Sequence, residues 1–188
     1  MCGRYFIDPD DIELEELLSL TEKLLADASG LPPLKGGEIF PGATVPVITA
    51  DKTQLMIWGY PGFAAKRPLI NARSETAAVK KTFSAAMAAR RCLIPASGYY
   101  EWKTLGNKRK EKYAFRLSDR TIMLMAGIYA PGGRFAILTR EAAPAISEIH
   151  NRMPVIIPRN LSAAWLSVTP EALREAADDV FFTLAPSS

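Results

Sequence analysis

The feature that most constrains this fold is a run of strand-like segments in the middle of the chain, with no helix between them. The segments are rich in β-branched and aromatic residues, and turn-forming residues separate them. They cover residues 92–102, 112–118, 121–130 and 134–139. Because short turns join antiparallel strands, whereas parallel strands need long crossover connections, this run predicts an antiparallel sheet.

Other elements flank this run. Residues 44–49 and 53–58 predict a hairpin about residues 50–52, and residues 180–184 predict a last strand, whereas the Gly/Pro-rich segment 30–43 is expected to hold no regular structure. Helices are expected over residues 8–30, 74–91, near Pro144, and over 162–166 and 170–177. Since helices lie between or outside the groups of strands, we expect an α+β fold with a curved, mainly antiparallel, barrel-like sheet and flanking helices.

Composition narrows the protein class. A chain of 188 residues with 48% apolar and 23% charged residues predicts one globular domain over residues 1–188, and a monomer is the default. No apolar run reaches the roughly 20 residues of a membrane span, so we expect a cytoplasmic protein.

Cys2 and Cys92 are the only cysteines and His150 the only histidine, and no glycine-rich phosphate loop occurs, so neither a metal nor a cofactor is expected. We expect Cys92, in an apolar segment, to be buried and inert.

Charge favours polyanionic partners only weakly, because the net charge is +3. Much of the positive charge clusters around a turn at Gly106-Asn107, for which a solvated hairpin tip is the simplest interpretation. The cluster contains Lys103, Lys108, Arg109, Lys110 and Lys112.

The chain opens with Met-Cys-Gly-Arg. Methionine before a small residue is a substrate for N-terminal trimming, which would leave Cys2 with a free amine and a thiol on one residue, a 1,2-aminothiol. The alternative is that Cys2 begins a strand and its thiol only fills space, since free cysteine is among the most buried residue types.

Three other polar stretches, residues 71–76, 97–102 and 148–155, lie at the ends of expected strands or helices, where distant segments converge on one cleft. Taken singly, each has a structural interpretation. Asn71 would cap the following helix, Glu101 would be an edge-strand carboxylate, and a lone histidine is often structural. Their joint occurrence favours a functional site.

Together these motifs resemble those of the SRAP family, the SOS response-associated peptidase or abasic-site-processing proteins. The resemblance runs over nearly the whole chain, with the motifs in the family's order and approximate spacing. They are "MCGR", Trp58-Gly59, "INARSET", "RRCLIPASGYYEW", "ILT" at residues 137–139 and "IHNRMPVII".

The resemblance implies a protein that covalently traps abasic sites in single-stranded DNA through its N-terminal cysteine. It implies that Cys2 is the nucleophile, with Asn71, Glu101 and His150 completing the site. It also implies that the DNA contacts are phosphate-binding arginines and aromatic rings that wall the cleft. These are Arg4, Arg73, Trp58, Phe63 and Trp102, of which Phe63 stands where the family often has tryptophan.

The chemistry follows from the residue types. A terminal amine has a pKa of about 7.7 to 8.0 against about 10.4 for lysine, so its reactive fraction at neutral pH is roughly a hundredfold larger. It would form an imine with the opened sugar aldehyde, and the thiol of the same residue would close a five-membered thiazolidine, which prevents strand cleavage by elimination. Glu101, partly desolvated by Tyr100 and Trp102, would act as general acid, while His150 exchanges protons and Asn71 orients the reacting groups.

Two other functions and one other role for the arginines stay open. In the first, the chain is an N-terminal-nucleophile or cysteine hydrolase in which Cys2 is the nucleophile for acyl transfer, and self-removal of Met1 is a narrower form of this activity. In the second, the chain is a non-covalent binding module for damaged single strands. Arg4 and Arg73 would alternatively form surface ion pairs with acidic residues.

Overall fold

The computed structural model describes residues 2–8, 10–11, 36–62, 67–106, 108–167, 175–176 and 178–185. The helices expected over residues 8–30 and 170–177 lie mostly outside the described residues. Within the described part of the chain, no helix is both long and apolar enough to cross a membrane.

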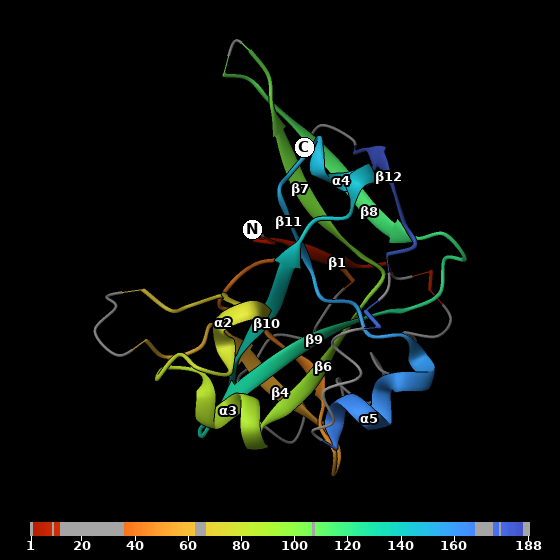
Figure 1. Ribbon diagram of the computed structural model, residues 1–188. Helices are drawn as coiled ribbons and strands as arrows, with labels where there is room; N and C mark the ends of the chain where they lie inside the picture. Colours follow the sequence, from red (N-terminus) through yellow and green to blue (C-terminus); the bar gives the residue numbers. More distant parts are fainter. Residues whose placement is uncertain are drawn as a thin grey trace.

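One sheet has five strands in the order β12-β8-β7-β1-β2, and all its pairings are antiparallel. Its longest strands, β7 and β8, form a hairpin that projects beyond the rest of the molecule (Figure 1). The strands are β1 (Tyr5–Ile7), β2 (Gly37–Ile39), β7 (Gly98–Thr104), β8 (Lys110–Leu117) and β12 (Val180–Leu184).

The second sheet closes into a barrel, because its path β10-β4-β3-β6-β9 returns to β10 through the pairing of β9 with β10. Only the pairings of β10 with β4 and with β5 are parallel among the described strands. The expected α+β fold with a curved, mainly antiparallel sheet is therefore confirmed. The strands are β3 (Thr44–Ile48), β4 (Thr53–Trp58), β5 (Asn71–Arg73), β6 (Arg91–Ala96), β9 (Met123–Ala130), β10 (Arg134–Glu141) and β11 (Arg152–Pro154).

Alternating side chains divide the core into two layers. On β6, Cys92 and Ile94 face a cluster that joins the barrel interior to the five-stranded sheet, whereas Leu93 faces a second cluster outside the barrel. Short helices cover that outer cluster (Figure 1), and Trp165 on one of them donates its indole N–H to the carbonyl of Cys92 at 2.8 Å. They are α2 (Ser74–Ala77), α3 (Ser84–Ala89) and α5 (Ser162–Leu166), while α4 (Pro144–Ser147) and the 3-10 turn η1 (Arg159–Leu161) lie in the connections.

The single helix expected over residues 74–91 is wrong, because α2 and α3 are separate. Six residues at about 100° each place Ala77 and Phe83 on widely different faces of one straight helix, yet both side chains are buried. The break lets Phe83 turn inward and pack edge-on against Tyr60 at a centroid distance of 5.3 Å.

Two other expectations need correction. The segment 30–43 was expected to be irregular, yet it contains β2, whose residues gain backbone partners on β1. The segment 92–102 is not one strand, because Ser97 interrupts it and its halves join different sheets. At the crossing, a Cβ on Gly98 would overlap the carbonyl oxygen of Phe115 and lie 2.6 Å from Cζ of Phe6, so only glycine fits.

Candidate active site

Strand β10 gathers the polar stretches of the sequence. Its second half pairs with β5 on one edge, where Ile137 faces Asn71, and with β11 on the other, where Thr139 faces Pro154. Residues 71–76 and 148–155, which are far apart in the chain, therefore meet at the C-terminal end of one strand.

Cys2 lies fully buried just before β1. Its S–H donates to the carbonyl oxygen of Arg4 at 3.8 Å. Burial raises the pKa of this thiol far above its ordinary value, and the neighbouring Glu101 carboxylate raises it further. The thiol is therefore held in its protonated form at neutral pH.

Asn71 tethers this segment from β5. Its side-chain Nδ2 donates to the carbonyl oxygen of Cys2 at 2.8 Å, across 69 positions of sequence. Its Oδ1 is buried and has no hydrogen-bond partner among the described residues, which leaves an acceptor beside Cys2. The helix-cap alternative for Asn71 is wrong, since α2 begins at Ser74 with Arg73 at its N-cap position.

Glu101 on β7 and His150 before β11 form an acid–base pair. The Glu101 side chain is only 4% exposed, and its Oε2 lies 3.8 Å from His150 Nε2. The Arg152 backbone holds the ring at Nδ1, with its amide nitrogen 3.0 Å and its carbonyl oxygen 3.2 Å from that atom. The other ring nitrogen, Nε2, therefore points toward the Glu101 carboxylate.

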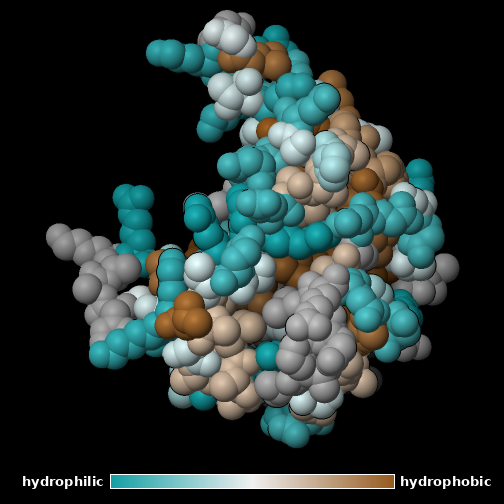
Figure 2. Space-filling view, viewed as in Figure 1, coloured by the Kyte–Doolittle hydropathy of each residue, from teal (hydrophilic) through white to brown (hydrophobic). Residues whose placement is uncertain are grey.

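A cleft of about 900 Å³ opens over this pair. In Figure 2, hydrophilic side chains dominate the hollow between the β7–β8 hairpin at the top and the barrel below. The lining residues come mainly from β7, β8 and the end of β12. They include Arg4, Glu101, Trp102, Arg109, Lys110 and His150.

Arg4 makes the ion pair that the sequence left open as an alternative to phosphate binding. Its Nη1 donates to Glu38 Oε2 at 2.8 Å, and its guanidinium lies over the rings of Phe40 and Trp102 at 4.3 and 5.0 Å. Burial opposes ionisation of Glu38, but its bonds to Lys112 and Arg4 outweigh this and lower its pKa. One carboxylate thus holds two cations beside the cleft.

The expected aromatic and basic contacts separate into different positions. Trp102 lines the cleft, and Arg73 is exposed at the start of α2. Trp58 is fully buried and donates its indole N–H to the carbonyl of Ile70 at 2.9 Å. No face of Trp58 is open to solvent, so the expectation that it stacks on a base is wrong. Phe63 lies outside the described residues.

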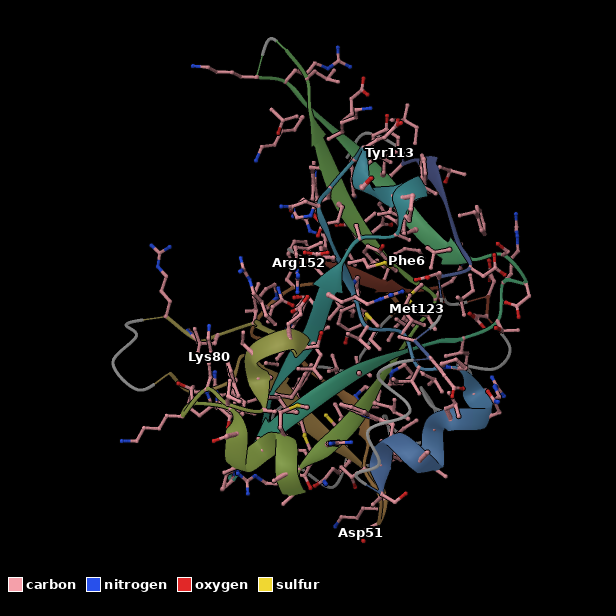
Figure 3. All side chains as sticks on the ribbon, viewed as in Figure 1. Phe6, Asp51, Lys80, Tyr113, Met123 and Arg152 are labelled. Atoms are coloured by element: carbon pink, nitrogen blue, oxygen red, sulfur yellow. The ribbon has the colours of Figure 1, made fainter. Side chains whose placement is uncertain are left out.

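Sequence reasoning missed one interaction, which joins three of the motifs. The buried guanidinium of Arg152 donates to both carboxylate oxygens of Glu75, at 2.6 and 2.9 Å, and to the carbonyl of Thr139 at 2.6 Å. Figure 3 labels Arg152 beside the end of β10. All three residues belong to quoted motifs, but only tertiary structure shows that they meet. Arg152 therefore locks the His150 segment against the Asn71 segment.

The expected burial of Cys92 is confirmed. This cysteine is fully buried in β6, and burial raises the pKa of its thiol. Within the described residues, no three potential metal ligands of the His, Cys, Asp or Glu type cluster together.

Known proteins resemble this chain in sequence and in fold. The family model described as SOS response associated peptidase (SRAP) matches residues 1–185. Abasic site processing protein YedK of Escherichia coli (strain K12) is 30% identical over 178 residues, which cover 88% of this chain and 79% of YedK. Abasic site processing protein HMCES of Mus musculus is 29% identical over 141 residues, 56% of this chain and 40% of HMCES. A crystal structure of a Bacteroides thetaiotaomicron protein has the same fold, with a TM-score of 0.77 at 20% identity, over 98% of this chain and 92% of that one.

Proposed function

The chain belongs to the SOS response associated peptidase (SRAP) family, and on this basis we propose that it processes abasic sites in single-stranded DNA by covalent trapping at Cys2. The observation that carries the proposal is the convergence of four distant segments. A bond of 2.8 Å joins Asn71 to Cys2, and Glu101 lies 3.8 Å from His150. The Glu101 carboxylate also helps to raise the pKa of the Cys2 thiol, which relates the two pairs. The crosslink would shield the lesion from strand cleavage during the DNA damage response.

The reaction begins once removal of Met1 frees the amine of Cys2. The amine attacks the aldehyde of the ring-opened sugar, and loss of water gives an imine. The thiol then adds across the carbon–nitrogen double bond: a carbon–sulfur bond forms, and the thiol proton passes to nitrogen. The product is a thiazolidine, in which no imine remains to promote elimination of the 3′ phosphate.

The site residues have separate roles in this scheme. Glu101 gives a proton to the sugar ring oxygen as the ring opens, and His150, whose Nε2 faces it, returns the proton. Asn71 fixes the Cys2 backbone so that nitrogen and sulfur reach the same carbon. The high pKa of the thiol leaves the first attack to the amine, because a neutral thiol is a weak nucleophile.

The same pKa argues against the hydrolase alternative. Acyl transfer by cysteine needs a thiolate, which is favoured by positive surroundings. At Cys2, burial and the Glu101 carboxylate both disfavour it. Covalent capture by the amine needs no thiolate in its first step.

The test is a denaturing gel of protein mixed with a single-stranded oligonucleotide that carries one abasic site. We expect a shifted band that is lost in Cys2→Ala or after acetylation of the amine and kept in Cys92→Ala, the matched buried-thiol control. A shift seen only on native gels would support a binding module instead. Cleavage of a peptide ester without any shifted band would support the hydrolase.

A further inference from the structure

The positive charge of the protein is concentrated at the end of the β7–β8 hairpin. This basic arm holds five cations and one carboxylate, Glu111, whereas the whole chain has a net charge of only +3. The rest of the chain is therefore net negative. The cations of the basic arm are Lys103, Lys108, Arg109, Lys110 and Lys112. A solvated tip explains why these residues are exposed, but not why the positive charge is gathered there.

The register of the hairpin aligns part of this charge with Trp102, which lines the cleft, whereas the Glu101 side chain, one residue earlier on β7, points to the other face of the hairpin. Trp102 pairs with Lys112, and Thr104 with Lys110, so both lysines share one face of the hairpin with the Trp102 ring. Lys112 bonds to Glu38, and Lys110 stands about 7 Å further along the same face, toward the tip of the hairpin.

The basic arm and the active site share one cleft. Arg109 and Lys110 line the same cleft as Glu101 and His150. The hairpin leaves the body of the molecule in a single direction (Figure 1), so its charge lies on only one side of the acid–base pair.

We infer that the basic arm binds the backbone phosphates of the DNA strand that flanks the abasic site, on one side of the lesion only. This inference rests on the proposed function, because it takes the strand at Glu101 and His150 to be DNA. The Trp102 ring suits a stacked base, and Arg109 and Lys110, which line the same cleft, suit backbone phosphates. The arm thus supplies affinity without reading sequence.

The test compares two variants that each lose one arginine and one lysine. Arg109→Gln/Lys110→Gln alters the basic arm, and Lys52→Gln/Arg159→Gln alters exposed residues that do not line the cleft. Binding is measured by fluorescence anisotropy with strands that carry a tetrahydrofuran abasic analogue, which has no aldehyde and cannot crosslink. The strands are extended on the 5′ side only, the 3′ side only, or neither, and each is titrated at several salt concentrations.

We expect extension on one side to tighten binding by the wild type and by the control variant, and this gain to be lost in the arm variant. The slope of log K against log salt becomes shallower by about 1.4 in the arm variant, since each contact to a single strand contributes about 0.7. Equal slopes for the two variants would overturn the inference, as would an equal loss of affinity for all three strands. Failure of covalent trapping would appear separately, as no crosslink to a true abasic site while the difference in slope persists.

Discussion

Glu75→Gln tests how the Arg152 bonds hold the site together. The Arg152 side chain is 10% exposed and that of Glu75 is 44% exposed. Losing the carboxylate charge leaves a buried guanidinium beside neutral acceptors alone, namely the Thr139 oxygens and the new glutamine amide oxygen. Exposed pairs contribute up to about 1 kcal/mol, and breaking a buried pair costs about 3–5 kcal/mol. With one partner buried and the other half-exposed, we expect the variant to lose about 2 kcal/mol of unfolding free energy.

Urea unfolding measures this loss as a lower midpoint with an unchanged m-value. Glu111→Gln is the matched control, because its ion-pair partner Arg109 is 70% exposed at 3.9 Å. The Tyr113 hydroxyl, which donates to Glu111 at 3.2 Å, can donate to a glutamine oxygen as well, so we expect a change below about 0.5 kcal/mol. His150 is the only histidine, so its ¹⁵N spectrum reports the site directly. In Glu75→Gln we expect the His150 ring signals to shift, because the Arg152 backbone that holds Nδ1 loosens.

The pH dependence gives a second check. The bonds to Arg152 lower the pKa of Glu75 in the folded protein. The Glu75 carboxylate therefore stabilises the fold above its unfolded pKa of about 4.3, and this stabilisation is lost as the pH falls through its lower folded pKa. Glu75→Gln should therefore flatten the acid limb of the stability curve. Equal stability of Glu75→Gln and Glu111→Gln, together with an unchanged histidine spectrum, would refute the reasoning.

Three other predictions concern the core and the cleft. Gly98→Ala should lower the unfolding free energy by about 2 kcal/mol in thermal unfolding, because the added Cβ meets the Phe115 backbone. Gly106→Ala, where an added Cβ has no neighbour within 4 Å, should change it little, and equal melting temperatures of the two variants would contradict this. Burial raises the pKa of the Cys92 thiol, so above the unfolded pKa of about 8.5 the contribution of Cys92 to the unfolding free energy falls by about 1.4 kcal/mol per pH unit. Cys92→Ala should therefore make the alkaline fall of the stability curve shallower by that amount, and parallel curves for the two proteins would contradict this. Trp102→Ala should weaken binding to single strands by about 1–3 kcal/mol with an unchanged salt slope, measured by anisotropy, whereas a shallower slope would mean that its effect comes through phosphate contacts.

The strands were predictable because their signal is local. Alternation places Cys92 and Ile94 on one side of β6 and Leu93 on the other, and turn residues mark the ends of β3, β4 and β8–β10. A curved, barrel-like sheet was predicted, but not the strands that close it. Which strands close it depends on the pairing of β9 with β10 and the parallel pairing of β10 with β4, and no local pattern carries that information.

The failures follow from tertiary packing. The helix over residues 74–91 satisfies local propensity, but burial of both Ala77 and Phe83 breaks it. Trp58 lies in a motif of the site, yet its ring stacks on Phe135 in the core. The lock between Arg152 and Glu75 spans 77 positions, a separation at which sequence patterns do not specify contacts.

The covalent claim is tested most directly by the intact mass of the crosslink before and after borohydride. An abasic strand trapped by the trimmed chain should have the mass of protein plus DNA minus one water, unchanged by the reductant, because a thiazolidine has no carbon–nitrogen double bond to reduce. A gain of two hydrogens would identify a simple imine formed without sulfur. That result, or the absence of any adduct on a chain with a verified free Cys2 amine, would contradict the account.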